Sequence, residues 1–388
     1  MLKEKEASAV IYLRNGKIYA PEVLGKKNIL IGGQKILTIT DKDLSSLSSE
    51  LNGIELDIED MLVLPGFIDP HIHLTGGGGE GGPESRAPEA KISELIEAGI
   101  TTAIGVLGTD SITRSLENLL AKTKALNNMG MTALMYTGAY RIPSPTLTGS
   151  IMRDLVLIQE VIGVKIALSD HRGSYPTTEE LKRIASECRV GGMLSGKAGI
   201  VHIHMGKDPT MLNQLWEIIN NTNIPITQFL PTHMTRTAEL LEEAKKWLKE
   251  GGICDFTAGK NTAQALQELK ESKVPMNVTI STDAYGSAPK FQANGNLISI
   301  GIGSPDSLFE VFKQLYSKFD WKIEKILPFF TKNVARTLQL KDKGEIVQKY
   351  DADLIIVDPE FKIQYAISKG KIVKTPEWTF QGYYKHNK

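Results

Sequence analysis

The fold of this chain is decided by one stretch, Pro65-Gly66-Phe67-Ile68-Asp69-Pro70-His71-Ile72-His73. The apolar run Met61 to Leu64 leads into it, and a glycine-rich segment follows it directly. Side chains alternate along a β-strand, so His71 and His73 project from the same face. Two neutral imidazoles at a strand end form half of a divalent metal site. For an isolated His-x-His pattern, a pair of surface histidines on an edge strand is the alternative.

Length and charge are those of an ordinary globular protein. The 388 residues are enough for one large domain and a smaller one, and 41% of them are hydrophobic. Lysine plus arginine and aspartate plus glutamate number 45 each, so no net charge attracts nucleic acid or an anionic membrane. We therefore expect neither as a partner.

Cysteine usage and the absence of long apolar runs indicate the compartment. Cys188 and Cys254 have no metal-binding spacing and cannot make a disulfide framework, which fits a reducing cytosol. The first residues are charged and lack the apolar centre of a signal peptide. No apolar run approaches the ~20 residues that span a bilayer. We expect a cytoplasmic protein.

Both ends of the chain contain short strand patterns separated by turns. Asn15-Gly16 predicts a two-residue hairpin turn near the N-terminus, and Lys369-Gly370 predicts another near the C-terminus. Neither end alone offers a complete sheet, so the strands of both ends should pair with each other. The sequence predicts one small β-sandwich domain built from residues 1–62 and 342–388.

Between these ends, over residues 63–341, strand patterns alternate with helical ones. The eight expected strands are, in chain order, 67–74, 101–107, 132–137, 161–168, 199–204, 226–233, 252–256 and 278–283. Thr177 to Glu180 read as a capping box that opens one of the helices. Eight strands that alternate with helices favour an α/β protein with a (β/α)8, TIM-like barrel.

In such a barrel the chemistry lies at the C-terminal ends of the strands. Those ends hold two histidines on the first strand, a lysine on the fourth, and further ligand types on strands five, six and eight: His71, His73, Lys165, His204, His233 and Asp283. His202 forms a second His-x-His with His204. We interpret it as a packing residue one layer deeper in the barrel, hydrogen-bonded rather than metal-bound.

Lys165 lies inside the apolar strand 161–168. A charged amine is costly there, so its pKa should fall and the amine should become nucleophilic. A neutral amine can capture carbon dioxide as a carbamate, whose two oxygens could bridge two cations. The alternative is a lysine that reaches the strand end or pairs with Asp170.

The succession His-x-His, Lys, His, His, Asp on barrel strands resembles the amidohydrolase superfamily and, within it, the family of bacterial isoaspartyl (β-aspartyl) dipeptidases. The likeness to the dipeptidases rests on the loop Gly76 to Glu80, on Tyr140, and on Arg172 and Arg236. It extends over nearly the whole chain, including the β-domain split between the two ends.

The resemblance implies an enzyme with two Zn2+ ions per subunit. One ion would be held by His71, His73 and Asp283, the other by His204 and His233, with a carboxylated Lys165 bridging them. A hydroxide shared by both ions would be the nucleophile, and Asp283 would act as general acid and base. Tyr140 would donate a hydrogen bond to the developing oxyanion, although a packed aromatic residue is the alternative there.

The resemblance also implies contacts with a small dipeptide substrate, through Gly78, Gly79, Glu80, Thr109, Tyr140, Arg172, Arg236 and Ser287. A β-aspartyl dipeptide carries one free amine and two carboxylates. One anion and two cations complement this pattern, because an arginine binds a carboxylate with two parallel hydrogen bonds. Surface ion pairs with Asp170 or nearby glutamates are the alternative for the arginines.

Two alternatives concern the function class, and one expectation concerns assembly. A cyclic amidase or an N-acyl amino acid deacetylase could use the same metals, and a catalytically dead scaffold would lack some of the ligands. Relatives form large homo-oligomers, so the resemblance implies a homo-oligomer, with an octamer as one form. An exposed apolar face on the helix that carries Leu308 and Leu315 would favour such assembly.

Overall fold

The computed structural model describes residues 10–292 and 297–383. Its larger part contains a six-stranded sheet in the order β11-β10-β9-β8-β7-β6, in which all neighbours are parallel. The strands are β6 (Phe67–Ile72), β7 (Ile100–Gly105), β8 (Thr132–Gly138), β9 (Val161–Leu168), β10 (Ile200–Met205) and β11 (Phe229–Thr232). Two more strands, β12 (Cys254–Thr257) and β13 (Val278–Ser281), form a parallel pair.

The end of β13 returns to the first strand of the barrel. Ile72 and Ala284 form a parallel bridge, and the amide of Asp283 donates to the carbonyl of His71 over 3.1 Å. The amide of His73 in turn donates to the carbonyl of Ala284 over 3.0 Å. Each of the eight predicted strands is present, and the predicted (β/α)8 fold is confirmed.

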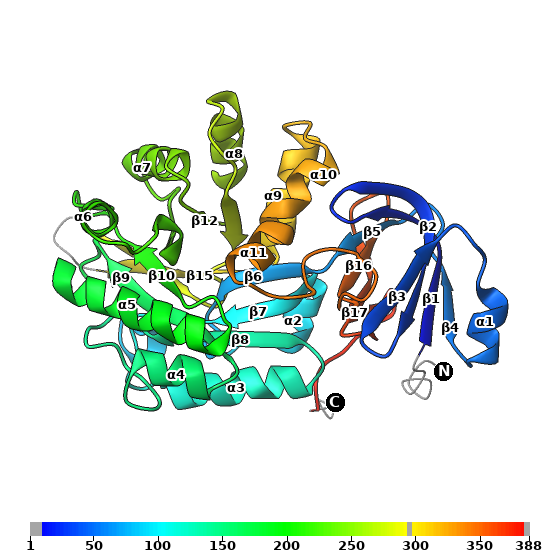
Figure 1. Cartoon of the computed structure of the whole chain (residues 1–388), viewed down its shortest axis with the longest axis horizontal. Coiled ribbons are helices and arrows are strands. Elements are labelled where there is room, and N and C mark those ends of the chain that lie inside the picture. Colours follow the sequence, from blue (N-terminus) through cyan, green and yellow to red (C-terminus); the bar gives the residue numbers. More distant parts are fainter. Residues whose placement is uncertain (1–9, 293–296, 384–388) are drawn as a thin grey trace.

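Helices follow the strands and cover the outside of the barrel (Figure 1). They are α2 (Ile92–Glu97), α3 (Leu116–Asn128), α4 (Ile151–Leu157), α5 (Thr178–Ser195), α6 (Asn213–Asn221), α7 (Ala238–Lys249), α8 (Thr262–Glu271), α9 (Ser307–Ser317), α10 (Ile323–Ile326) and α11 (Lys332–Thr337). The predicted capping box at the start of α5 is confirmed, because the side chains of Thr177 and Glu180 each accept from the other's backbone amide.

The two ends of the chain form a nine-stranded sheet beside the barrel (Figure 1). It contains β1 (Val10–Tyr19), β2 (Val23–Gly32), β3 (Lys35–Thr40), β4 (Ile54–Asp57), β5 (Leu62–Pro65), β16 (Leu354–Val357), β17 (Ile363–Ser368), β18 (Lys371–Thr375) and β19 (Trp378–Thr379), and the short α1 (Ser45–Glu50) precedes β4. β5 pairs antiparallel with β16, which joins the two ends. A β-domain built from both ends is thus confirmed, while its boundaries stay a prediction.

The hairpin predicted at Asn15-Gly16 is wrong, whereas the turn at Lys369-Gly370 is confirmed. β1 runs straight through Asn15, which has a φ of 63° and marks a shift in the register with β2. β1 also pairs with β4 and β5 on its other side, so tertiary pairing keeps the strand continuous and the Asn-Gly becomes a bulge. Lys369-Gly370, with φ of 46° and 70°, connects β17 to β18.

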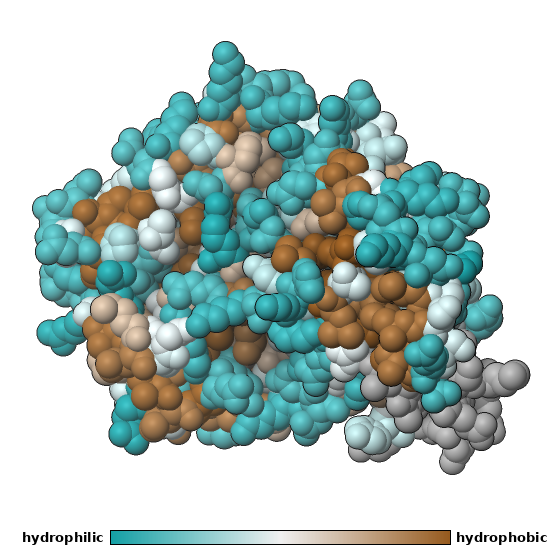
Figure 2. Space-filling view, turned by 45° about the vertical axis from the view of Figure 1, so that its right-hand side comes forward, coloured by the Kyte–Doolittle hydropathy of each residue, from teal (hydrophilic) through white to brown (hydrophobic). Residues whose placement is uncertain are grey.

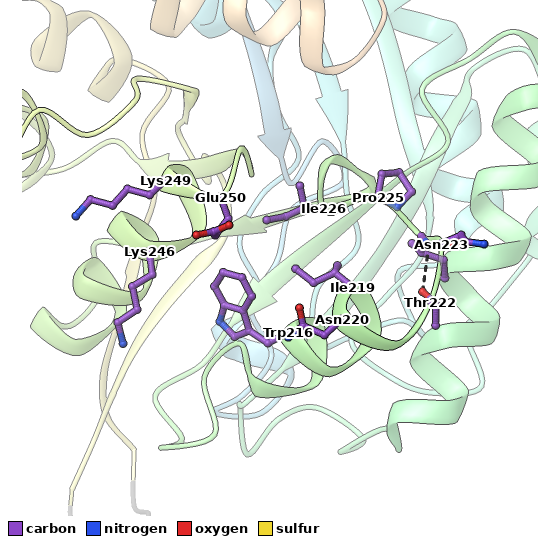
Figure 3. Close-up of a pocket in the computed structure, with 11 residues that line it drawn as sticks. Trp216, Ile219, Asn220, Thr222, Asn223, Pro225, Ile226, Lys246, Lys249 and Glu250 are labelled. Atoms are coloured by element: carbon purple, nitrogen blue, oxygen red, sulfur yellow. Dashed lines mark hydrogen bonds between the residues drawn. The ribbon is translucent and has the colours of Figure 1, made fainter.

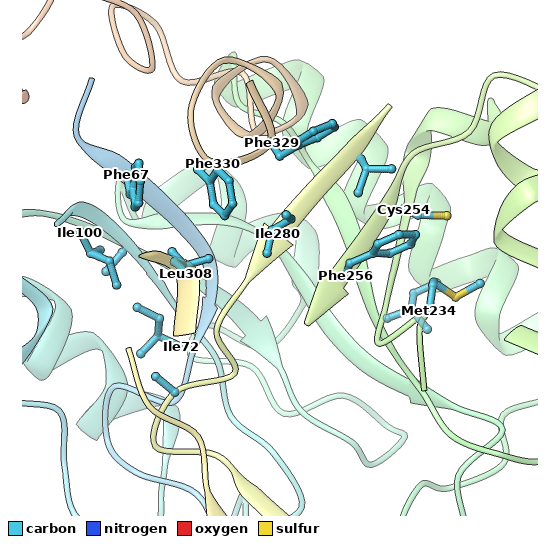
Figure 4. Close-up of a cluster of buried hydrophobic side chains, with 14 of the residues drawn as sticks. Phe67, Ile72, Ile100, Met234, Cys254, Phe256, Ile280, Leu308, Phe329 and Phe330 are labelled. Atoms are coloured by element: carbon cyan, nitrogen blue, oxygen red, sulfur yellow. The ribbon is translucent and has the colours of Figure 1, made fainter. Parts of the chain in front are cut away.

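Aromatic side chains fill the core between the barrel strands and α9 (Figure 4). Phe67 stacks on Phe330 with ring centroids 5.2 Å apart, and Phe309 and Phe312 approach the ring of Phe67. The expectation that α9 exposes an apolar face is wrong, because this face packs into the chain's own core; its residues Leu308, Val311, Phe312 and Leu315 are all buried.

Large apolar side chains remain exposed elsewhere, including Met193 and Leu194 on α5. Ile298 and Ile302 are also exposed, on the hairpin formed by β14 (Ser287–Phe291) and β15 (Leu297–Ile302). Figure 2 shows one face of the molecule, on which hydrophobic patches alternate with hydrophilic ones. Among the described residues, no helix combines the length and the apolar character needed to cross a membrane. The homo-oligomer and the compartment stay predictions.

Candidate active site

Three predicted metal ligands come together where β6 and β13 end. The Nε2 atoms of His71 and His73 lie 3.3 Å and 3.2 Å from the same carboxylate oxygen of Asp283. One ligand atom from each of the three residues lies within 4.8 Å of the other two. Both histidines are buried, so this group combines two imidazoles and one carboxylate in a site largely closed to solvent.

The backbone at the strand ends is in an unusual conformation where it carries these side chains. His233 and Asp283 have φ values of 66° and 54°, in the left-handed region that non-glycine residues rarely adopt. Residues held in this region concentrate at functional sites, where the surrounding structure maintains them. Gly286 lies close by, and a Cβ there would come within 2.5 Å of the Asp283 carboxylate. This position therefore requires glycine.

Lys165 lies within β9 and is fully buried. Its Nζ is 3.4 Å from Nε2 of His71, and it forms no ion pair with Asp170 or any other described carboxylate. Burial lowers the pKa of Lys165 to about 7, although the charges of Asp283 and Asp255 oppose this effect. The alternative of a lysine that reaches solvent or pairs with Asp170 does not describe this side chain.

His204 and His233 lie next to each other, with ring centroids 4.4 Å apart. The Nε2 atom of His233 is buried, has no hydrogen-bond partner among the described residues, and lies 4.0 Å from Asp283 Oδ2. Both nitrogens of His204 are engaged, Nδ1 with the Tyr140 hydroxyl and Nε2 with Asp170 Oδ2 at 2.8 Å. The structure thus brings these two histidines beside the first three residues without gathering all five into one ligand cluster.

Burial determines the protonation of the histidines. It lowers the pKa of His71, His204 and His233 well below the ordinary value, and nearby positive charges act in the same direction. The rings are therefore neutral at physiological pH. A neutral imidazole carries one free lone pair, which is the form that binds a metal ion.

Four predicted substrate contacts form one network around Glu80. Its Oε1 accepts hydrogen bonds from Ser287 over 2.7 Å, from Arg172 over 3.2 Å and from Thr109 over 3.3 Å. Its Oε2 is buried and has no partner among the described residues. Gly78 and Gly79 precede it with φ of 82° and 106°, a backbone that brings the loop back toward Arg86. One carboxylate oxygen is thus fixed and the other is available.

The two arginines differ in their surroundings. Arg172 is only 12% exposed; it makes a two-pronged ion pair with Asp170, and its guanidinium lies 5.6 Å from the centre of the Tyr140 ring. Arg236 contacts His204 Nε2 at 3.1 Å and donates to the Met205 carbonyl over 2.6 Å. The alternative pairing with Asp170 therefore occurs for both arginines, since Arg236 Nη1 also lies 3.8 Å from Asp170 Oδ2, but around a buried carboxylate rather than at the surface.

A cavity lies over these residues. It is lined by predicted site residues from both the metal group and the substrate group: His73, Gly78, Thr109, Tyr140, Arg172, Asp283 and Ser287. Three further lining residues, Gly77, Gly108 and Asp110, are neighbours of predicted contacts in the sequence to which the prediction assigned no role. Asp170 contacts His204 and Arg172, and the sequence predicts it only as an ion-pair partner of Lys165 or the arginines. Its place directly after β9 was the signal that could have identified it.

A second hollow, between α6 and α7, is separate from this site (Figure 3). Trp216 and Ile219 from α6 line it, together with Lys246 and Lys249 from α7. None of the predicted site residues contributes to it. The cavity at the strand ends is therefore the candidate active site.

Comparison with known proteins identifies the family. Residues 62–374 match the amidohydrolase family. The chain belongs to the amidohydrolase family. The crystal structure of β-aspartyl dipeptidase from Fervidobacterium islandicum AW-1, in complex with a β-Asp-Leu dipeptide, is 43% identical to this amidohydrolase, with a TM-score of 0.91. The alignment covers 98% of this chain and 100% of that chain.

More distant relatives share part of the chain or the fold alone. Dihydroorotase from Staphylococcus aureus is 26% identical over 204 residues, which are 50% of this amidohydrolase and 45% of that enzyme. This match thus spans less than half of the length of dihydroorotase. Dihydropyrimidinase from Brevibacillus agri NCHU1002 shares the fold, with a TM-score of 0.66 over 96% of each chain at 13% identity.

These comparisons confirm two predictions. The resemblance to the β-aspartyl dipeptidases holds over nearly the full length, and this amidohydrolase is an enzyme of the hydrolase class. The alternative of a catalytically dead scaffold is correspondingly not favoured, because all six predicted metal ligands are present. The roles of the individual site residues stay predictions.

Proposed function

We propose that this amidohydrolase hydrolyses β-aspartyl dipeptides, releasing aspartate and a free amino acid. The observation that carries the proposal is the fixed Glu80 carboxylate, whose partners Arg172 and Ser287 line the same cavity as His73 and Asp283. An acid and two arginines beside a candidate metal site complement the one amine and two carboxylates of such a dipeptide. The similar Fervidobacterium enzyme, crystallised with β-Asp-Leu, supports the same substrate.

The donor set fits two zinc ions. It consists of neutral, buried imidazoles with one carboxylate, and Nε2 of His233, which no described residue hydrogen-bonds, is available as a ligand. His71, His73 and Asp283 would hold the first ion, and His204 and His233 the second. To take part, His204 must exchange either Tyr140 or Asp170 for the ion, because both of its nitrogens are engaged.

Lys165 would complete the site as a carbamate. With its pKa lowered to about 7, Lys165 holds far more neutral amine at neutral pH than an ordinary lysine does. This amine attacks carbon dioxide, forms an N–C bond and releases one proton, which leaves a carboxylate with two oxygen donors. A carboxylate on this buried side chain stabilises nearby cations that the uncharged amine could not hold together.

Zinc, when bound, supplies a Lewis acid that polarises the scissile carbonyl and lowers the pKa of water toward ~7. Asp283 accepts the proton of the attacking water and passes it to the leaving amine as the C–N bond breaks. Tyr140 donates a hydrogen bond to the oxygen on which negative charge develops. Burial raises the pKa of Tyr140 well above its usual value, so its hydroxyl keeps the proton that this role requires.

The substrate contacts define the linkage that is cleaved. The available Oε2 of Glu80 would bind the free amine, while Arg172 and Arg236 would bind the two carboxylates, and Thr109, Ser287 and the backbone of Gly78 and Gly79 complete the contacts. An α-linked dipeptide moves the first carboxylate onto the side chain. Amine and carboxylates then no longer reach their partners while the carbonyl remains at the metal site.

A cyclic amidase is the second candidate, and the partial match to dihydroorotase favours it. A cyclic amide such as dihydroorotate has no free amine, so it offers nothing to the available oxygen of Glu80. The longer and closer match to β-aspartyl dipeptidase, together with the Glu80 network, supports the dipeptide instead.

The test is a comparison of four substrates with the zinc-loaded enzyme: β-Asp-Leu, α-Asp-Leu, N-acetyl-β-Asp-Leu and dihydroorotate. We expect rapid release of leucine from β-Asp-Leu alone. Equal rates on the first three would contradict the dipeptide proposal, and preferential turnover of dihydroorotate would support the cyclic amidase.

A further inference from the structure

Among the described residues, His202 is the one histidine of the barrel interior that the proposed chemistry does not use. It lies on β10 two residues before His204 and is fully buried. Its Nε2 is 3.1 Å from Nδ1 of His71, which confirms the expectation that it is hydrogen-bonded. The other nitrogen of its ring, Nδ1, has no partner among the described residues. Among the described residues, the hydrogen bonding that starts at His71 thus ends at His202.

A stacked aromatic ring holds His202 in place. The ring of Tyr136 lies parallel to it, with an interplanar angle of 2° and centroids 4.9 Å apart. The rings of His71 and His202 are nearly perpendicular, with an interplanar angle of 86° and centroids 4.8 Å apart. Contacts with both rings restrict the orientation of the buried His202 side chain.

The proton in this bond can take two positions. The two ring nitrogens lie 3.1 Å apart and share one hydrogen bond, so one of them must carry the proton and the other must accept it. Both rings are fully buried, where a neutral imidazole with one N–H is favoured over a charged one. If His202 donates, the proton of His71 must be on Nε2, the atom that faces Lys165 and Asp283. If His71 donates from Nδ1, its Nε2 carries a free lone pair. Only the second arrangement can bind a metal ion.

We propose that His202 is a positioning residue which accepts the Nδ1 proton of His71 and thereby holds His71 in the tautomer that ligates metal. This inference rests on the proposed metal site. Without the acceptor, the proton of His71 can move to Nε2 and be donated to Asp283, 3.3 Å away, which removes two ligand atoms at once. A histidine in this place performs the part that a carboxylate or a backbone carbonyl performs for most metal-bound histidines.

The test uses two variants of nearly equal shape. His202→Gln keeps a side-chain oxygen that can accept from His71, whereas His202→Met has none. Tyr136→Phe is the matched control, because it removes a buried hydroxyl that has no partner among the described residues and leaves the stacked ring. We would measure zinc content at fixed free zinc, the rate of zinc loss to a competing chelator, and thermal unfolding of the chelated protein.

We expect His202→Met to hold one of the two zinc ions about 10–100-fold more weakly, as for other lost partners of metal-bound histidines. His202→Gln should regain most of that affinity, and Tyr136→Phe should match the wild type. Equal zinc affinity in Met, Gln and wild-type proteins would overturn the inference, and so would equal losses in both variants at this position. A wild type that binds no metal would instead contradict the proposed metal site itself.

A second measurement does not depend on folding of the variants. Nitrogen NMR of the histidine rings in wild-type protein, with and without zinc, reports which nitrogen carries the proton. We expect a protonated Nδ1 on His71 and an unprotonated Nε2 on His202 in the zinc-loaded protein. A proton on Nε2 of His202 in that state would overturn the proposal.

Discussion

Arg172 and Asp170 form a two-pronged ion pair beside the candidate metal site. Nε of the arginine donates to Oδ1 over 3.0 Å, and Nη2 donates to Oδ2 over 2.9 Å. Oδ2 also lies 2.8 Å from Nε2 of His204. Hydrogen bonds from His204 and Arg172 overcome the effect of burial and hold the pKa of Asp170 well below its usual range. Arg172 also donates to Oε1 of Glu80 over 3.2 Å. Through Asp170, it therefore connects the predicted metal ligand His204 to Glu80.

Arg172→Lys should lower kcat/KM for β-Asp-Leu by about 10–100-fold, because an ammonium cannot reproduce three directed N–H groups and loses charge-assisted hydrogen bonds worth ~1.5–3 kcal/mol. Zinc content should stay at the wild-type value. Steady-state kinetics and metal analysis check both points, with the exposed Arg183→Lys on α5 as the control. Unchanged kinetics would show that Arg172 does not contact substrate.

Glu80→Gln should raise KM for β-Asp-Leu by about 10-fold or more, with a smaller effect on kcat. The amide keeps the shape of the side chain but cannot offer a negative charge to the free amine of the substrate. Glu84→Gln changes an exposed carboxylate of the same loop and should have no effect. If Glu80→Gln acted equally on β-Asp-Leu and on its N-acetylated form, the amine contact would be refuted.

Lys165→Met should abolish zinc-dependent activity and at the same time stabilise the metal-free protein. The pKa of Lys165 is about 7 in the folded wild type and 10.5 in an ordinary lysine. At any pH below 10.5, folding must therefore either bury the charged ammonium or release its proton. This cost is fully present below pH 7 and fades as the pH rises toward 10.5. We therefore expect a gain of a few kcal/mol at pH 6 and little gain at pH 10.

Denaturant unfolding in the presence of a chelator measures this gain at both pH values. Lys260→Met, at an exposed position, provides the control and should show neither effect. A gain that is the same at pH 6 and pH 10 would mean that Lys165 is not buried as an amine of lowered pKa.

Asp283→Asn should lower kcat by about 10²–10⁴-fold, since the amide cannot accept and return a proton. Asparagine adopts positive φ readily, so the backbone at 54° should be retained and the variant should unfold near the wild-type temperature. KM should change much less than kcat. Turnover close to the wild type over the whole pH range would exclude Asp283 as the general acid and base.

Much of the barrel and of the site was predictable because parallel strands have simple rules. Buried strands read as apolar runs, and their C-terminal ends meet at one end of the barrel. Alternation along β6 places His71 and His73 on one face, and the structure does bring them to Asp283, more than 200 residues away.

What sequence could not give depends on contacts between distant segments. Nothing local shows that Ser287 holds Glu80, because these residues are 207 positions apart. The Asn15-Gly16 pattern is the same in a hairpin and in a bulge, and only the pairing of β1 with β4 and β5 decides between them. Likewise, an apolar helix face such as that of α9 looks alike whether its own core or another subunit covers it.

Arg114 holds the base of the loop that carries Glu80, and this leads to a last prediction. It is buried, and its guanidinium donates to the carbonyl of Thr75 and, over 2.6 Å, to that of Ala87. Arg114→Met leaves both carbonyls without this donor, which should cost ~1–3 kcal/mol of stability. Because the loop loses its brace, KM for β-Asp-Leu should rise several-fold while zinc content and kcat change little.

The matched control is Arg153→Met, since Arg153 also donates to a backbone carbonyl, that of Thr148 over 3.0 Å, but at an exposed site. It should leave both KM and stability near the wild-type values. Kinetics with β-Asp-Leu and denaturant unfolding of the zinc-loaded proteins separate the two variants. If Arg114→Met lost stability but kept the wild-type KM, the arginine would support the fold without positioning Glu80.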